Sequence, residues 1–403
     1  MRSQTRVLCD LALTDPGVVA DPYPHFSAAR EQGAVQWHEG LGMWLTFTYA
    51  AGNAVLRSRT LGRIWKPRWP DEPMPAFALI HVNSLLENEP PAHTRLRRLV
   101  ASAFARGHVE RLRPRVRELA ARLADRVEDE GSDGSAVDLI ATYAEPMPVQ
   151  VIAELLGVPE RDWHLLRPWS NAIVKMYEYA VSPAQREAAE RASSEFVEYL
   201  RSLVATRRQT PSDDLISSLI AETDVDGAKL SEDELITTCT LLLNAGHEAT
   251  VNVVGNGVTA LLGHPEQLAA TGEGGDTVVT AVEELIRYDS PLQLFERTAT
   301  ADTEIEGVII EQGAKIAALL GAANRDPAVF ADADALDVRR ADNAHIGFGA
   351  GIHFCVGAPL ARVELQTSLQ TLLTRFPRLA LHDQPRRRPE FVIRGVESLP
   401  VTI

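Results

Sequence analysis

Cys355 lies in a ten-residue segment, residues 348–357, that contains three glycines. The next five residues, 358–362, carry a proline at the second position and predict the start of a helix. The N–H groups at a helix N-terminus and the positive end of the helix dipole stabilise a thiolate. Glycine lets a backbone turn tightly and approach a flat ligand. These residue types predict that Cys355 is a thiolate metal ligand, with an inert buried cysteine as the alternative.

A second group of residues that could do chemistry, Asn244–Thr250, lies in the middle of a long predicted helix. Ser231 and Glu234 form a capping box at the start of this helix, and Gly263 followed by His-Pro ends it. Roughly 31 residues at about 1.5 Å each give a rod of about 46 Å. A rod of this length should cross the whole molecule.

The middle of this helix is apolar nearly all round, so the helix should be buried. Burial of Glu248 is costly unless its carboxylate is paired, protonated or in contact with water. The small residues Ala245 and Gly246 would let a flat object approach the helix backbone. The alternative is a kinked core helix with a satisfied Glu248. A metal site made by His247 and Glu248 would have too few ligands.

Two pairs of charged residues have helical spacing. Glu284 and Arg287 are three residues apart, and His93 and Arg97 are four residues apart, so each pair shares one helix face. An arginine in such a position can bind a carboxylate with two hydrogen bonds. Taken alone, each pair could equally be solvated on the surface.

The elements that must position these residues are mostly helical by their hydrophobic period. Helices are predicted over residues 113–130, 183–208, 231–262, 277–289 and 358–376. Two hairpins are predicted around glycine-containing turns, one joining residues 34–38 to 43–47 and one joining residues 304–310 to 315–320. The predicted fold class is therefore mainly α with small β-sheets (α+β).

The composition of the 403-residue chain, 45% apolar and 24% charged, is typical of globular proteins. The formal charge of −15 argues against partners such as nucleic acid or an anionic membrane surface. Three cysteines favour a reducing compartment and exclude a disulfide framework. No uncharged stretch reaches membrane-spanning length, and residues 1–16 lack the apolar core of a signal peptide. We expect a cytoplasmic protein with no membrane segment.

The segment around Cys355 resembles the haem-ligating loop of the cytochrome P-450 superfamily. The positions that match the family pattern are Phe348, Gly349, Gly351, His353, Cys355 and Gly357. Further motifs of the family occur in its order along nearly the whole chain. The resemblance implies that residues 1–403 form a single domain with the cytochrome P-450 fold, a long central helix and a haem-thiolate loop.

The resemblance also implies the cofactor and its contacts. Haem b would be bound with Cys355 as the proximal ligand of the iron. The residues implied to hold the haem propionates are His93, Arg97, Arg297 and His353. Phe348, Gly349 and Ala245 would lie against the haem. Arg340 would join Glu284 and Arg287 in a buried charge cluster that is structural rather than catalytic.

The reaction implied by the resemblance is monooxygenation, in which two electrons and two protons are used with O₂. The chain has no GxGxxG fingerprint for a flavin or nicotinamide, so the electrons must come from outside. In similar soluble bacterial enzymes the donor is an acidic ferredoxin, supplied by an NAD(P)H-dependent ferredoxin reductase. Candidates for a basic docking patch are Arg95, Arg98, Arg106 and Arg362, with a solvated basic face as the alternative.

The sequence departs from the family on the oxygen side of the haem. Ala249 stands where the family has a threonine that helps to deliver protons, and Thr250 follows one residue later, about 100° around the helix. Three hypotheses stay open. Thr250 substitutes through a shifted or water-bridged helix, a substrate hydroxyl or amide holds the water, or the reaction, such as oxidative coupling or ring formation, does not need the usual relay. Glu248 is the best candidate for proton entry.

The substrate pocket of similar enzymes corresponds here to residues 77–86, 243–249 and 292–295. Candidate substrate contacts are Leu86, Asn244, Ala245, Leu292 and Leu294. These segments are mostly apolar with a few polar side chains, which suits a medium-sized apolar molecule with one or two hydrogen-bonding groups. By analogy we expect a tailoring step in secondary metabolism.

Two other functions are alternatives to monooxygenation with external electrons. A thiolate-haem gas sensor would bind a diatomic ligand without turnover and would not need Glu248. A peroxide-driven oxygenase of the fatty-acid type would place an Arg-Pro pair in the groove, and residues 244–250 contain neither.

Overall fold

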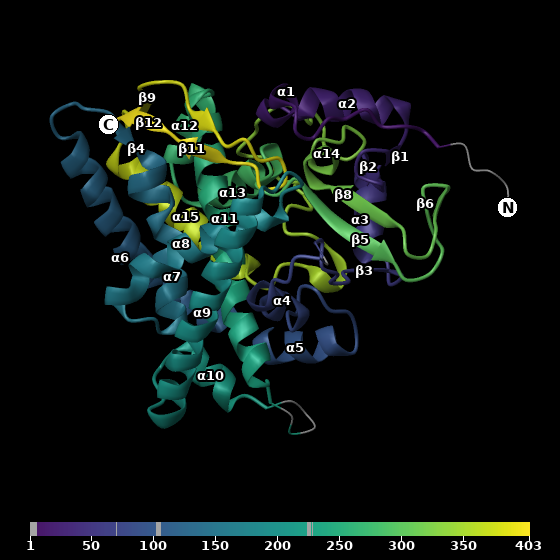
Figure 1. Cartoon of the computed structure of the whole chain (residues 1–403). Helices are drawn as coiled ribbons and strands as arrows, with labels where there is room; N and C mark the ends of the chain where they lie inside the picture. Colours follow the sequence, from purple (N-terminus) through teal and green to yellow (C-terminus); the bar gives the residue numbers. More distant parts are fainter. Residues whose placement is uncertain (1–5, 70, 102–105, 224–226, 228) are drawn as a thin grey trace.

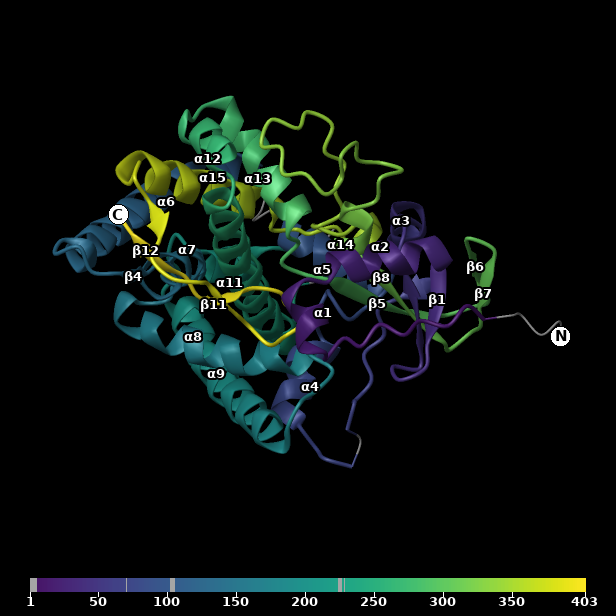
Figure 2. The same ribbon diagram turned by 90° about the horizontal axis from the view of Figure 1, so that it is seen from above.

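The structure is a computed structural model that describes residues 6–69, 71–101, 106–223, 227 and 229–403. Figures 1 and 2 show most helices gathered on one side of the molecule and the largest sheet on the other. The α-helices are α1 (Pro16–Ala20), α2 (Tyr23–Gln32), α3 (Tyr49–Arg57), α4 (Pro75–Val82), α5 (Ala92–Ala101), α6 (Arg106–Gly131), α7 (Pro146–Leu156), α8 (Trp163–Val174), α9 (Pro183–Gln209), α10 (Leu215–Ala221), α11 (Glu232–Leu262), α12 (Pro265–Gly272), α13 (Asp276–Tyr288), α14 (Leu320–Asn324) and α15 (Ala358–Arg375).

The strands are short. They are β1 (Val35–His38), β2 (Met43–Thr46), β3 (Leu61–Gly62), β4 (Val137–Asp138), β5 (Leu294–Ala299), β6 (Thr303–Ile305), β7 (Val308–Ile310), β8 (Lys315–Leu319), β9 (Ala380–Leu381), β10 (Arg386–Arg387), β11 (Val396–Ser398) and β12 (Pro400–Thr402). The mainly α fold with small sheets that the sequence predicts is confirmed.

The long central helix is α11, as predicted. Ser231 accepts the backbone N–H of Glu234, and the Glu234 side chain accepts the N–H of Ser231, which completes the capping box. The helix packs against α4, α7, α8, α9, α13 and α15. It therefore lies inside the helical part of the molecule, as both views show.

The helices α9, α13 and α15 agree with their predicted ranges to within one residue at each end. The prediction for α6 is too short, because the helix begins at Arg106 rather than at residue 113 and contains Pro114 in its interior. Proline is most common in the first turn of a helix, so the sequence pattern places the start too late.

The five-stranded sheet has the order β1-β2-β8-β5-β3. The predicted hairpin of β1 and β2 is confirmed, with Trp37 opposite Trp44. The central strand β8 pairs in parallel with β2 and antiparallel with β5. This arrangement puts Arg297 of β5 inside the sheet, opposite Ile316 of β8.

The second predicted hairpin is wrong. The turn lies earlier, between β6 and β7, where Glu306 and Gly307 both have a positive φ, of 46° and 78°. Two successive positive φ values suit the tight turns that join antiparallel strands. The segment predicted as one strand is thereby folded on itself, and β8 is free to pair inside the large sheet.

Among the described residues, no helix is both long and apolar enough to cross a membrane. The description of residues 1–403 as a single domain stays a prediction.

Candidate active site

The segment that carries Cys355 folds as a tight loop before α15. The backbone N–H of Cys355 donates to the carbonyl of Phe348 at 2.9 Å and closes the loop. Gly349 and Gly351 have φ of 73° and 69°, a conformation that glycine adopts without strain. A Cβ on Gly351 would lie 2.4 Å from the carbonyl oxygen of Leu56, so only glycine fits there. The glycines therefore fix the shape of the loop that presents the sulfur.

The thiol of Cys355 lies at the start of α15, as predicted. Burial raises its pKa on balance, although hydrogen bonds from the backbone N–H groups of Gly357 and Ala358 act in the opposite direction. The guanidinium groups of Arg97 and Arg362 also favour the thiolate. The surroundings thus supply donors and positive charge to a thiolate, and metal coordination would complete its deprotonation.

The middle of α11 has an accessible side. Ala245 is exposed and Ala249 is partly exposed, although Asn244, Glu248 and Thr250 are buried. Since α11 is enclosed by other helices, this exposure indicates open space beside the Ala245–Ala249 face. Gly246 points elsewhere, because a Cβ at this position would lie 3.0 Å from Ile152 of α7. The close approach that Gly246 permits is therefore to a neighbouring helix.

The buried carboxylate of Glu248 is paired. Nη1 of Arg388, which follows β10, donates to its Oε2 at 2.8 Å. His247 lies on the other side, with Nδ1 at 4.0 Å from Oε1 of Glu248 and 3.3 Å from the Ser170 hydroxyl. Burial lowers the pKa of His247. Of the three ways to accommodate a buried glutamate, pairing is the one the structure uses.

The predicted propionate partners come from three parts of the chain. The rings of His93, in α5, and His353, in the thiolate loop, have centroids 4.5 Å apart. Nε2 of His93 and Nδ1 of His353 are buried without a hydrogen-bond partner. Burial lowers the pKa of His93 to about 4. Arg97 donates to the carbonyl of Phe354 at 2.7 Å, which ties α5 to the loop.

Arg297 is the buried cation of this group. It is 2% exposed, and Nη1 donates a hydrogen bond to the neighbouring carbonyl of Glu296 at 2.8 Å. Within the described part of the chain it forms no ion pair, and burial lowers its pKa to about 9. An unpaired buried guanidinium is costly and needs an anion.

These features fit a flat ligand that carries two carboxylates. The carboxylates would pair with the two histidine nitrogens that lack a hydrogen-bond partner and with the buried, unpaired Arg297. A flat metal complex would fit between the sulfur of Cys355 and the accessible face of α11. The donor set therefore fits haem.

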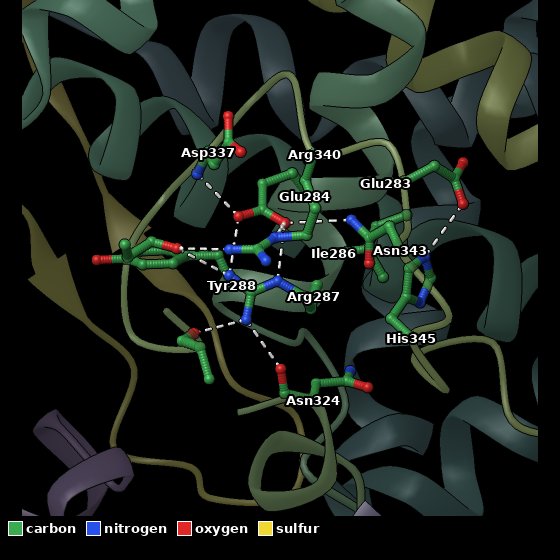
Figure 3. A network of polar contacts seen from close by, with 12 residues as sticks. Glu283, Glu284, Ile286, Arg287, Tyr288, Asn324, Asp337, Arg340, Asn343 and His345 are labelled. Carbon is green, nitrogen blue, oxygen red and sulfur yellow. Dashed lines mark hydrogen bonds and ion pairs between the residues drawn. The ribbon is translucent and has the colours of Figure 1, made fainter. Parts of the chain in front are cut away.

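Figure 3 shows the charge network around Glu284 and Arg287. Arg287 is fully buried and donates two hydrogen bonds, of 2.7 and 2.8 Å, to Glu284. Arg340 donates to the same carboxylate at 3.1 Å. Arg287 also donates to the carbonyls of Asn324, Ala333 and Ala335. Because all five N–H groups of Arg287 are satisfied within the protein, this cluster holds distant segments of the chain together.

Some of the predicted substrate contacts lie together. A cavity is lined by Leu86 and Asn244, together with residues of α4, Tyr177 and Thr240. Oδ1 of Asn244 is buried there without a partner. Leu294 lies outside this cavity and packs in a hydrophobic cluster with Phe26 and other residues, while Leu292 packs against the edge of that cluster.

The predicted docking arginines are partly engaged. Arg95 pairs with Glu234, and Arg362 donates to Glu283 at 2.7 and 2.8 Å. Arg98 is exposed. The side chain of Arg106 lies outside the described residues. Ile352 and Phe354, on either side of His353, are 43% and 40% exposed, which adds an apolar surface beside the loop.

Three residues of the site were not predicted from the sequence. Arg388 pairs with Glu248, and Glu89 contacts His353. Arg63 pairs with Glu87 beside Arg297. No motif marks them. The Arg-Arg-Arg run at residues 386–388 is the one signal that could have suggested a partner for a buried acid.

Comparisons with known proteins agree on one family. A family model described as Cytochrome P450 matches residues 68–396. The cytochrome P450 monooxygenase PikC of Streptomyces venezuelae is 39% identical over 399 residues, covering 97% of this chain and 93% of the relative. The 6-deoxyerythronolide B hydroxylase of Saccharopolyspora erythraea is 38% identical over 397 residues, covering 95% and 96%.

Solved structures give the same result. The cytochrome P450 PksS of the Bacillus subtilis bacillaene polyketide synthase has a TM-score of 0.88 at 35% identity, covering 97% of this chain and 99% of that chain. P450BioI in complex with an acyl carrier protein ligated to hexadec-9Z-enoic acid has a TM-score of 0.90 at 35% identity, covering 96% and 100%.

Proposed function

Because the chain belongs to the cytochrome P450 family of haem-thiolate monooxygenases, we propose that Cys355 is its axial ligand and haem b its cofactor. The chain is an oxidoreductase that acts on a small molecule and takes electrons from redox partners. The observation that carries the assignment of Cys355 is the set of backbone N–H donors and arginines around its sulfur. When bound, the haem binds and activates dioxygen, and thiolate donation favours O–O cleavage.

The propionates would be held by His93, Arg97, Arg297 and His353. In support, His93 and His353 each have a buried ring nitrogen without a partner. Arg97 and Arg297 each donate to a carbonyl that an anion could replace. Phe348, Gly349 and Ala245 would line the haem. Such positioning residues fix the orientation of the cofactor, which the chemistry of the site then depends on.

The proposed proton route starts at Glu248, with Thr250 nearby and Ala249 in the position of the family threonine. The carboxylate of Glu248 accepts a hydrogen bond from Arg388, and the proposed route requires this contact to open. Ala249 has no hydroxyl that could hold a water molecule. We propose that a substrate group or Thr250 holds this water instead, or that the reaction does not need the usual proton relay.

The proposed substrate is a medium-sized, mostly apolar product of secondary metabolism. The names of the 6-deoxyerythronolide B hydroxylase and of the polyketide biosynthesis cytochrome P450 PksS support this class. The proposed contacts are Leu86, Asn244, Ala245, Leu292 and Leu294. Leu86 and Asn244 share a cavity, which makes them the better supported members of this set. The product is an oxygenated or oxidatively coupled molecule.

The proposed electron donor is a ferredoxin with an NAD(P)H-dependent reductase. Exposed Arg98 of α5 and the exposed apolar side chains of Ile352 and Phe354, in the loop that carries Cys355, are the proposed parts of its docking surface. Arg95 and Arg362 are engaged by Glu234 and Glu283, which reduces the positive charge that they would present to a donor. A cytoplasmic location stays a prediction from the sequence.

The function is tested in two steps on the haem-loaded chain. A compound library is first screened for shifts of the haem spin state, which report displacement of the iron-bound water. Each hit is then incubated with a surrogate ferredoxin, its reductase and NADPH. Faster NADPH consumption with an oxygenated product supports the proposal. Ligand binding without turnover across the panel would favour a gas sensor, and turnover with peroxide alone would favour a peroxide-driven enzyme.

A further inference from the structure

Glu89 connects the two histidines proposed to hold the propionates. Its main-chain carbonyl accepts the N–H of His93 at 3.1 Å, at the start of α5. Its side-chain Oε1 accepts a hydrogen bond from Nε2 of His353 at 2.8 Å. The same oxygen accepts the backbone N–H of Arg63 at 2.7 Å. One residue thus fixes His93 through the backbone and His353 through its carboxylate.

The carboxylate reaches His353 across the bare backbone of β3. A Cβ on Gly62 would lie 2.8 Å from Cγ of Glu89, a distance that real Cβ contacts do not show. Gly62 pairs with Thr298 of β5, the residue next to Arg297. Glu89 therefore lies where the three segments that carry His93, His353 and Arg297 come together.

The hydrogen bond with Glu89 determines which ring nitrogen of His353 is available to a ligand. Nε2 is engaged by Glu89, whereas Nδ1 is buried without a partner, as is Nε2 of the neighbouring His93. We propose that Glu89 is a positioning residue for the cofactor, which holds the His353 ring so that Nδ1 is directed to a haem propionate. Residues behind the direct ligands often set the orientation of those ligands in this way. The inference rests on the proposed haem site and adds a residue that does not touch the haem.

The test is a double-mutant cycle on haem retention. Haem transfer from the loaded chain to excess apomyoglobin is timed for the wild type, Glu89→Ala, His353→Ala and the double variant. In the wild-type background, Glu89→Ala is expected to speed haem loss by about tenfold or more, which is the size of effect that such supporting contacts have. In the His353→Ala background, the same change is expected to speed haem loss by less than about twofold. An unchanged rate, or an equal acceleration in both backgrounds, would overturn the proposal, because a purely structural role does not depend on His353.

Glu89→Gln keeps the size of the side chain but removes its negative charge, so it weakens the hydrogen bond to His353 and decides the matter if the alanine variant does not accumulate. It is expected to lose haem no more than about threefold faster, while the propionate bending band in the resonance Raman spectrum moves in the direction seen for His353→Ala. A band that stays in place in Glu89→Gln but moves in His353→Ala would overturn the proposal.

Glu283→Gln is the matched control, since Glu283 also contacts a histidine, His345 at 3.1 Å, which is not among the proposed propionate partners. It should leave the propionate band unchanged. A wild type that shows no thiolate-type spectrum would refute the proposed haem site itself, which separates the two failures.

Discussion

The carboxylate of Glu248, in the middle of α11, lies 2.8 Å from the guanidinium of Arg388, which is 140 residues further along the chain. Glu248 is 4% exposed and the side chain of Arg388 is 15% exposed, so the carboxylate is nearly removed from water. A charge in such a place depends on its partner, and the loss of one member leaves the other uncompensated.

Replacement of Arg388 with methionine should therefore destabilise the fold. We expect the free energy of unfolding to fall by about 3 kcal/mol, because Glu248 is then buried without a counter-ion. Denaturant unfolding of the haem-loaded chain measures this. The double variant Glu248→Gln/Arg388→Met should recover most of the loss, and a double variant no better than the single one would show that the pair does not carry the effect.

The charge cluster around Glu284 should be more sensitive still. Glu284→Ala removes the acceptor of Arg287 and Arg340, and the fully buried Arg287 loses its counter-ion. We expect a loss of about 3–5 kcal/mol, measured as unfolding free energy or as failure to accumulate folded chain. Glu304→Ala, at an exposed position in β6, should change stability by less than about 0.5 kcal/mol. Equal effects at the two positions would contradict the structural role of the cluster.

Glu283 should make stability depend on acid pH. Burial alone would raise its pKa, but hydrogen bonds from Arg362 and His345 outweigh burial and lower the pKa from 4.5 to about 2. A carboxyl group whose pKa falls on folding stabilises the fold above its unfolded pKa, and this contribution disappears as the pH drops through the folded value. The free energy of unfolding of the wild type should therefore exceed that of Glu283→Gln by about 2 kcal/mol near pH 7. This difference in free energy should shrink as the pH falls from 4.5 to 2. Urea unfolding at a series of pH values tests this, and a difference that does not vary with pH would contradict it.

Ala249→Thr probes proton delivery. The change restores a hydroxyl at the position of the family threonine, so the fraction of NADPH electrons that end in product should change by more than about twofold, well inside the range that a positioned proton donor commands. The measurement is the ratio of product formed to NADPH consumed with a substrate found in the spin-state screen. An unchanged ratio would argue against any special proton route in this chain.

The features that were predictable from the sequence have local signals. The capping box at Ser231 and Glu234 and the stop at Gly263 define α11 because a helix end is determined by a few adjacent residues. The glycines around Cys355 likewise mark their own turn. The hairpin error has the same local origin, since the positive φ of Glu306 is unusual for a glutamate and leaves no clear turn signal.

The contacts that were not predictable join distant segments. Arg388 reaches Glu248 and Glu89 reaches His353 across 140 and 264 residues, and no spacing rule links such positions. The direction of Gly246 toward Ile152 was also hidden, because a small residue in a helix permits a close approach without indicating what approaches.

The central claim is that residue 355 holds the iron through sulfur. The measurement is the absorption spectrum of the reduced, haem-loaded chain under carbon monoxide, for the wild type and for Cys355→His. We predict the red-shifted Soret band of thiolate ligation in the wild type and its loss in the variant, which would show the spectrum of a nitrogen-ligated haem. A wild-type band at the nitrogen-ligated position, or a red-shifted band that survives in Cys355→His, would contradict the account.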